Sequence, residues 1–147
     1  MPEIKVRLAS AADAEALCAL NLAFNGEDGG EGLADAAMIR ASLAANPMEI
    51  VCLAEVSGKP AGFCCMLVKR SMCYATPSAE LTELYVAPEA RRRGVAEALV
   101  RFAEAQCRER FGVDGFHLLT GCGNEAAQAF YRKVEYQEKK EMYFEKG

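Results

Sequence analysis

One stretch of this chain, residues 81–100, decides its fold; the sequence there is LTELYVAPEARRRGVAEALV. Up to Val86 it is rich in apolar, β-branched and aromatic residues, which favours a strand. After Gly94 the apolar residues recur at the spacing of one buried helix face, at Val95, Ala98, Leu99, Phe102 and Ala103. A proline turn and three consecutive arginines separate the two segments. The stretch therefore predicts a strand, a turn and an amphipathic helix.

The start of this helix is suited to bind phosphate. The N–H groups of a first helical turn have no partner within the helix, and they lie at the positive end of its dipole. Gly94 and Ala96 have little or no side chain, so a bulky ligand could approach these groups, and Arg91 to Arg93 add charged donors. Three arginines can also form a merely solvated turn, but their place between strand and helix favours a polyphosphate site.

These residues resemble the pyrophosphate loop of the GCN5-related N-acetyltransferase (GNAT) superfamily, Gln/Arg-x-x-Gly-x-Gly/Ala, which Arg91, Gly94 and Ala96 match. A second similarity follows at residues 124–131, NEAAQAFY, which resemble the family's helix that begins at asparagine and ends in Phe-Tyr. The resemblance implies an enzyme that moves an acetyl group from acetyl-CoA to a primary amine, by direct attack in a ternary complex.

One departure from the family pattern lies just after that helix. The family's Gly-Phe step is replaced here by Glu135-Tyr136. If this position requires a left-handed backbone, Glu135 either costs about 1 kcal/mol of strain or imposes a different turn.

The apolar patterns and the resemblance predict a single α/β domain over residues 1–147. Its sheet is expected to be mixed and mostly antiparallel, flanked by helices, with a splayed parallel pair formed by the fourth and fifth strands. The predicted strands are residues 4–8, 50–56, 61–68, 81–86 and 116–120, with a closing strand at 138–145. The predicted helices are residues 10–24, 33–45 and 92–110, and a last helix capped by Asn124.

The resemblance also implies which residues bind acetyl-CoA. The pyrophosphate would contact Arg91, Arg92, Arg93, Gly94, Val95 and Ala96. The pantetheine arm would pair with the fourth strand at Leu84, Tyr85 and Val86, and contact Asn124, Ala127 and Tyr131.

Acetyl transfer to an amine needs a neutral nucleophile, a donor to the carbonyl oxygen and a proton for the departing thiolate. By resemblance, the backbone N–H of Leu84, at a bulge in the fourth strand, polarises the carbonyl, and the Tyr131 hydroxyl is the acid. A phenol of pKa about 10 is a reasonable proton donor to a departing thiolate whose thiol has a pKa of about 8.5. The alternative is that the Tyr131 ring serves only in packing. Glu83 is the candidate general base, acting through a water molecule. Because side chains alternate along a strand, Glu83 could instead point to solvent or form a salt bridge.

The acceptor is predicted to be a small cationic amine rather than a protein. In the family, the segment between the first two helices borders the acceptor pocket, and here it holds Glu27, Asp28, Glu31 and Asp35. The alternative is a solvated acidic loop. The sequence does not identify the amine.

Composition excludes several other functions. The chain is 52% hydrophobic and 26% charged, and its longest apolar run, residues 61–68, is too short to cross a bilayer. A net charge of −4 argues against nucleic-acid binding. No secretory signal is recognised, so a cytoplasmic location is expected.

The seven cysteines form no Cys-x-x-Cys pair and there is one histidine, so no metal site is predicted. Cysteines 18, 52, 64, 65, 73 and 107 are predicted to be small core residues, and Cys122 either packs or is a reactive thiol.

Two other functions fit parts of the sequence. Residues 121–126 match the dinucleotide pattern Gly-x-Gly-x-x-Ala, but too few residues follow to complete that fold. A non-catalytic acetyl-CoA sensor or assembly module would need the phosphate site but neither Tyr131 nor Glu83. The apolar residues Met142, Tyr143 and Phe144 are candidates for a homodimer contact.

Overall fold

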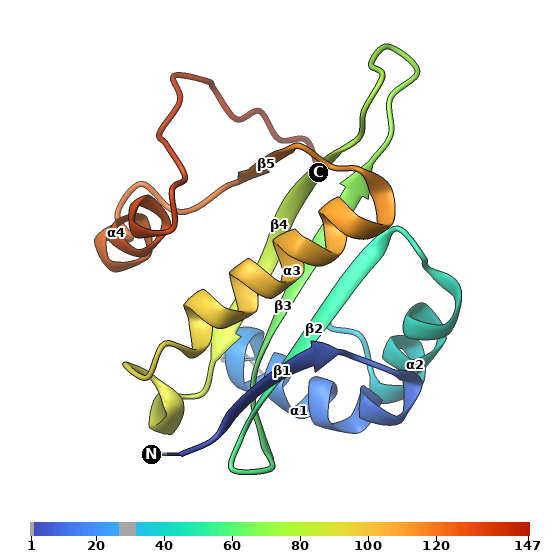
Figure 1. Ribbon diagram of the computed structural model, residues 1–147, viewed down its shortest axis with the longest axis vertical. Coiled ribbons are helices and arrows are strands. Elements are labelled where there is room, and N and C mark those ends of the chain that lie inside the picture. The colour runs from blue at the N-terminus through green and yellow to red at the C-terminus, as the bar shows by residue number, and fades with distance from the viewer. Residues whose placement is uncertain (1, 27–31) are drawn as a thin grey trace.

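The computed structural model describes residues 2–26 and 32–147 of the chain (Figure 1). Five strands form one sheet in the order β1-β2-β3-β4-β5, and neighbouring strands are antiparallel except for the parallel pair β4–β5. The strands are β1 (Ile4–Leu8), β2 (Glu49–Val56), β3 (Lys59–Lys69), β4 (Ser78–Val86) and β5 (Gly115–Leu118). The predicted mixed α/β sheet is confirmed.

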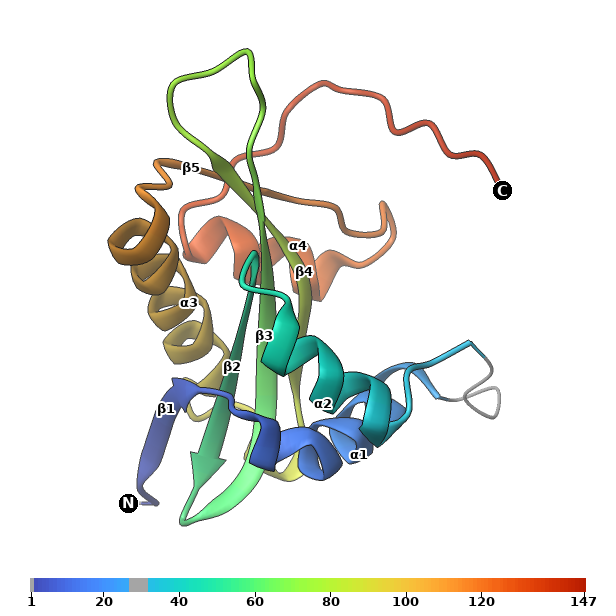
Figure 2. The ribbon, with the colours of Figure 1, turned by 90° about the vertical axis from the view of Figure 1, so that its right-hand side faces the viewer.

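Helices cover both faces of the sheet. One face carries α3 (Val95–Phe111), and the other carries α1 (Ala14–Asn25) and α2 (Ala36–Ala45), as Figure 2 shows from the side. The helix α4 (Glu125–Lys133) follows β5 and stands to the side of the sheet (Figure 1). Short 3-10 turns, η1 (Ala11–Asp13) and η2 (Pro88–Ala90), precede α1 and follow β4.

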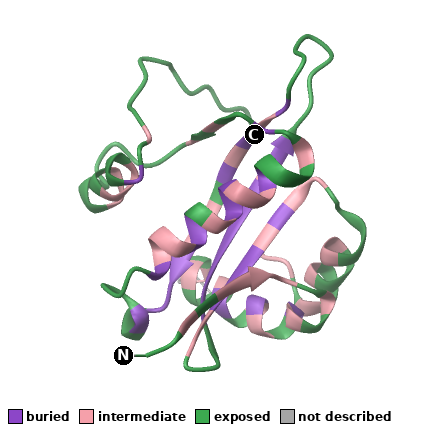
Figure 3. Ribbon diagram, in the orientation of Figure 1, coloured by how far each residue is buried: buried purple, intermediate pink, exposed green. Residues whose placement is uncertain are grey.

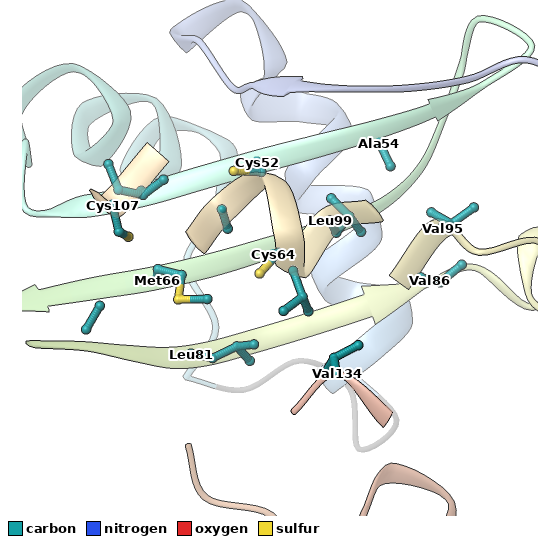
Figure 4. Close-up of a cluster of buried hydrophobic side chains, with 14 of the residues drawn as sticks. Cys52, Ala54, Cys64, Met66, Leu81, Val86, Val95, Leu99, Cys107 and Val134 are labelled. Atoms are coloured by element: carbon teal, nitrogen blue, oxygen red, sulfur yellow. The ribbon is translucent and has the colours of Figure 1, made fainter. Parts of the chain in front are cut away.

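The central strands bury side chains on both faces, which explains the nearly continuous apolar run of residues 61–68. Cys52 and Cys64 pack under α3, whereas their neighbours Leu53 and Phe63 pack under α1. Figure 4 shows the first of these clusters, and Figure 3 shows that burial is concentrated along β3 and the inner face of α3. Two core layers therefore meet across a single sheet.

The hairpin between β2 and β3 has a two-residue loop. Ser57 and Gly58 have φ of 51° and 80°, the left-handed pair of a type I′ turn. Val56 pairs with Lys59, so Lys59 and Pro60 belong to the strand rather than to the predicted turn.

The parallel pair β4–β5 is short. Ser78 to Leu81 pair with Gly115 to Leu118, and β5 then ends while β4 continues to Val86. The predicted splaying of these two strands is confirmed. Among residues 2–26 and 32–147, no strand pairs with this edge of β4 beyond Leu81.

Three helices begin later than predicted. In the first, residues 11–13 form the 3-10 turn η1, so α1 itself begins at Ala14. The helix α2 begins at Ala36 because the Asp35 carboxylate caps it, accepting the Met38 N–H at 2.8 Å. The helix α3 begins at Val95 because Arg92 and Gly94 have positive φ and cannot continue a helix.

The predicted closing strand at residues 138–145 is wrong: this segment has no regular secondary structure. Its apolar residues Met142, Tyr143 and Phe144 are consecutive, so they define no single face that could be buried against the sheet, and all three are exposed. Cys73 is also exposed, contrary to the expectation of a core position, and so is Cys122.

Glu135 takes the left-handed conformation, with φ of 78°, in the turn after α4. We expect Glu135→Gly to raise the free energy of unfolding by about 1 kcal/mol, because glycine adopts this conformation without a steric cost. The exposed ion pair from Arg101 to Glu135, at 3.2 Å, is lost in the variant but contributes little. Urea denaturation measures the change.

Glu138→Gly is the matched control, because it also removes an exposed ion pair, with Arg132 at 3.1 Å, but at a residue without positive φ. Glu138→Gly should not raise the free energy of unfolding. An equal or lower stability of Glu135→Gly relative to the parent protein would show that the turn is not strained.

Candidate functional site

The loop between β4 and α3 presents backbone N–H groups to open space. The first helical bond of α3 runs from Ala98 N–H to the Gly94 carbonyl at 3.0 Å, so the N–H groups of Val95 to Glu97 have no partner within the helix. Gly94 has φ of 81°, and a Cβ placed on it would meet no atom within 4 Å. The start of α3 is therefore accessible to a ligand of the size of a phosphate.

The three arginines of this loop differ in their surroundings. Arg91 donates from Nε to the Val86 carbonyl at 2.9 Å, and its guanidinium carbon lies 5.9 Å from the centre of the Tyr85 ring. All three arginines are exposed, and Arg92 and Arg93 lie beside the start of α3. Arg91 thus holds the loop against the end of β4, and the other two extend their charge toward solvent. Together with the free amides, these groups fit a pyrophosphate.

The open edge of β4 offers a short row of backbone groups. Ala87 donates to the Ala61 carbonyl on β3 at 2.7 Å, and hydrogen-bond direction alternates along an antiparallel strand. Tyr85 therefore bonds to β3, while Leu84 and Val86 direct their groups away from it. Arg91 occupies the Val86 carbonyl. Within the part of the chain that the structure describes, the free groups are therefore the N–H and C=O of Leu84 and the N–H of Val86.

Tyr85 contributes to this region mainly through packing. Its side chain is buried on the α1 side of the sheet, where the ring stacks on Phe24 with centroids 5.1 Å apart. The side chain thus lies on the other face of the sheet from α3.

The bulge of β4 lies at Thr82, not at Leu84 as predicted. Cys65 pairs with Glu83 and the next residue, Met66, pairs with Leu81, so Thr82 is the extra residue. Its hydroxyl donates to the Cys65 carbonyl at 3.3 Å. Because of this insertion, Leu81 faces α3 while Glu83, two residues on, faces the opposite side of the sheet.

Glu83 is half-buried near the end of α1. Burial raises the pKa of its carboxyl, and the nearby Glu49 carboxylate raises it further, whereas a hydrogen bond from Asn25 lowers it. A carboxyl with a raised pKa is a stronger base than an exposed one, so this environment suits proton transfer at neutral pH.

Tyr131 lies in the last turns of α4, packed against the core cluster under α3. Burial raises the pKa of its phenol, and Cys64 and Glu83 add to the rise. Its ring contacts those of Phe130 and Tyr136, with centroids 5.4 Å and 6.1 Å away. The hydroxyl therefore remains protonated well above neutral pH and is available as a donor.

The loop before α4 is ordered by two amide side chains. Asn124 Oδ1 accepts the Ala127 N–H at 3.1 Å, which caps the helix as predicted. Gln128 Nε2 donates to the carbonyls of Gly121 and Cys122, both at 2.9 Å. Gln128 did not emerge from the sequence, where a glutamine in a helix carries no signal of such a contact.

Three of the elements described above border the same core cluster. Leu84, Ala96 and Tyr131 come from β4, α3 and α4, and all three pack against the same core cluster. Glu83 lies close enough to Tyr131 to raise its pKa. The structure thus supplies a helix start with unpartnered N–H groups, a strand edge, a phenol and a carboxyl group.

The acidic residues expected at the acceptor side are only partly described. Glu27, Asp28 and Glu31 lie outside the described residues. Asp35 is used as the cap of α2. Glu49, which the sequence did not single out, lies on the same face of the sheet as Glu83 and influences its pKa.

No helix within residues 2–26 and 32–147 combines the length and the apolar character needed to span a membrane. The same residues contain no group of three or more histidine, cysteine, aspartate or glutamate side chains arranged to hold a metal ion.

A strand edge that leads into a helix start with unpartnered N–H groups is an arrangement that suits an extended ligand carrying a phosphate group. Residues 15–136 match the Acetyltransferase (GNAT) family. The chain therefore belongs to the GNAT family, whose members use acetyl-CoA.

Similar proteins agree with this family. The uncharacterized N-acetyltransferase MJ1207 of Methanocaldococcus jannaschii is 35% identical over 86 residues, which cover 58% of this chain and 38% of that protein. The alignment thus spans well under half of this curated relative.

Two solved structures share the fold. A putative acetyltransferase from Agrobacterium tumefaciens str. C58 superposes with a TM-score of 0.85 at 24% identity, covering 97% of this chain and 99% of that chain. The aminoglycoside N-acetyltransferase AAC(6')-Iy in complex with CoA superposes with a TM-score of 0.84 at 16% identity, covering 100% and 96%.

The contact between Arg91 and Val86 predicts unequal roles for the arginines. We expect Arg91→Lys to weaken CoA binding about tenfold, because lysine keeps the charge but lacks the Nε–H that holds the loop to β4. Arg93→Lys, which also keeps the charge, should weaken it about twofold at most. Isothermal titration calorimetry measures the Kd of each variant for CoA. Equal losses of affinity in the two variants would contradict the role of the Arg91 contact.

Proposed function

We propose that this protein is an acetyl-CoA-dependent N-acetyltransferase that transfers the acetyl group directly to a primary amine within a ternary complex. The observation that carries the proposal is the edge of β4 beyond Leu81, which presents the Leu84 N–H next to the half-buried Glu83 carboxyl, while Leu84 and Tyr131 both pack on the core cluster under α3. Each of these groups matches one requirement of acetyl transfer.

In the proposed complex, the pyrophosphate of acetyl-CoA is held by the first-turn amides of α3 at Val95 and Ala96, by Gly94, and by the loop arginines. The pantetheine arm pairs with Leu84 and Val86 and contacts the region of Asn124 and Ala127. The thioester then lies near Leu84. This arrangement uses backbone groups that have no other partner strand.

The proposed catalytic roles follow from whether each group donates or accepts a proton or hydrogen bond near neutral pH. The Leu84 N–H donates to the carbonyl oxygen as it gains negative charge. Glu83, with its raised pKa, removes a proton from the amine through a water molecule. Tyr131, whose phenol is protonated, supplies a proton to the departing sulfur. The raised pKa makes the Tyr131 phenol a weaker acid, but it also keeps the phenol protonated at neutral pH.

We further propose that the acceptor is a small cationic amine. Support comes from Glu83 and Glu49, which lie on the same face of the sheet, on the side of α1 and α2. AAC(6')-Iy is named as an aminoglycoside N-acetyltransferase, which is consistent with a polycationic acceptor. The second candidate function is an acetyl-CoA sensor, which needs the loop and strand edge but not the acid and base.

Tyr131→Phe tests the acid. We expect CoA binding to change less than twofold and turnover to fall about 100-fold, because a positioned general acid contributes on this scale. Tyr74→Phe removes an exposed hydroxyl on the β3–β4 loop and is the matched control. Thiol release with acetyl-CoA and an amine reports the rate, and full turnover by Tyr131→Phe would remove Tyr131 from the mechanism.

A panel of amines tests the acceptor. Spermidine, sisomicin, a peptide with an N-terminal alanine and the uncharged amine p-aminobenzamide are compared by kcat/KM with acetyl-CoA. We expect the polycations to exceed the uncharged amine at least about tenfold at low salt, and the difference to shrink as salt screens the acidic side chains. Equal rates would contradict the cationic acceptor, and CoA binding without thiol release from any amine would favour the sensor.

A further inference from the structure

The residues that follow α4 attach this helix to the core. None of its own residues is buried, and it stands beside the sheet rather than under a second layer (Figures 1 and 3). By contrast Val134, the first residue after the helix, is 2% exposed and lies in the core below α3 (Figure 4). The location of Tyr131 therefore depends on how the segment 134–136 is attached.

Tyr136 makes the strongest polar attachment of this segment. Its hydroxyl donates to Oε2 of Glu104 on α3 at 2.8 Å. Glu104 is 7% exposed and is the one charged or polar residue classed as buried among those the structure describes. Burial raises the pKa of the Tyr136 phenol, and the hydrogen bond and charge of Glu104 raise it further, so Tyr136 remains a donor.

Tyr136 also contacts Tyr131 in two ways. The Tyr136 N–H donates to the Tyr131 carbonyl at 2.9 Å, and the two rings meet edge to face with centroids 6.1 Å apart. Glu135, in its left-handed conformation, turns the chain back so that both contacts form. One side of Tyr131 thus rests on a residue whose far end is bound to α3.

We propose that Glu104 and Tyr136 are positioning residues that set the place of the Tyr131 hydroxyl relative to α3. The proposal rests on the proposed function, in which Tyr131 is the general acid. It explains why a carboxylate occupies a buried position on α3 where an apolar side chain would stabilise the fold as well. A hydrogen bond has a defined length and direction, whereas apolar packing alone permits the ring to shift.

A double-mutant cycle tests this coupling. Turnover with acetyl-CoA and the panel amine of highest kcat/KM is measured for the parent, Tyr136→Phe, Tyr131→Phe and the double variant, below their melting temperatures. We expect Tyr136→Phe to lower kcat about tenfold while the Kd for CoA changes less than twofold. In the Tyr131→Phe background the same substitution should have almost no effect. An equal effect in both backgrounds would overturn the proposal.

Glu104→Gln and Glu104→Leu separate positioning from stability. Glutamine keeps an oxygen that accepts the Tyr136 hydroxyl, so turnover should stay within about threefold of the parent. Leucine removes the acceptor, so turnover should fall as in Tyr136→Phe even if the melting temperature rises. A parent-like rate for Glu104→Leu would overturn the proposal.

A measurement that needs no acceptor amine separates a failure of this positioning role from a failure of the proposed enzymatic function. The chain has five tyrosines, so NMR of protein labelled with carbon-13 at the tyrosine Cζ gives one signal for each. In Tyr136→Phe the Tyr131 signal should shift, because the neighbouring ring is no longer held by the hydrogen bond to Glu104. Tyr74→Phe should leave it unchanged. An unmoved Tyr131 signal overturns the positioning role. Full turnover by Tyr131→Phe alone would instead refute the acid in the proposed function.

Discussion

The early separation of β4 from β5 is the constraint on which the site depends. Pairing stops at Leu81 and Leu118, so the following residues of β4 have a strand on one side only. Backbone groups away from water need partners, and a peptide-like ligand can supply them in place of a strand. A closed sheet would offer no such edge. The gap also leaves room for the last turns of α4, which bring Tyr131 to the same region.

Local backbone strain shapes both ends of this region. Arg92 in the loop before α3 and Glu135 after α4 are non-glycine residues with positive φ, of 64° and 78°. Arg92 lies in the loop proposed to bind the pyrophosphate, and Glu135 lies in the turn after the helix that carries Tyr131. The cost of such conformations is of the order of 1 kcal/mol each, and packing of the neighbouring helices maintains them. The bulge at Thr82 acts similarly, because it turns Glu83 to the other face of the sheet.

Much of the fold could be predicted from the sequence because periodicity reports burial directly. Alternation at residues 4–8, the two apolar runs of the hairpin and the stripe of α3 all mark elements that the structure contains. The alternation assigned to residues 138–145 fails at the three consecutive apolar residues 142–144. A strand also forms only when a neighbour completes its hydrogen bonds. The position of the bulge and the late start of α3 depend on local dihedral angles, which composition does not report.

The sequence by itself determined the class of this protein, because the loop motif around Gly94 and the helix that ends at Tyr131 are local patterns of residue type and spacing. Only the tertiary structure decided what each residue of those patterns contacts. It bound Arg91 to the Val86 carbonyl, left the Leu84 N–H free and joined Glu104 to Tyr136, which lie 32 residues apart in the chain. Such contacts join segments distant in sequence, and their direction follows from packing, which no local pattern encodes.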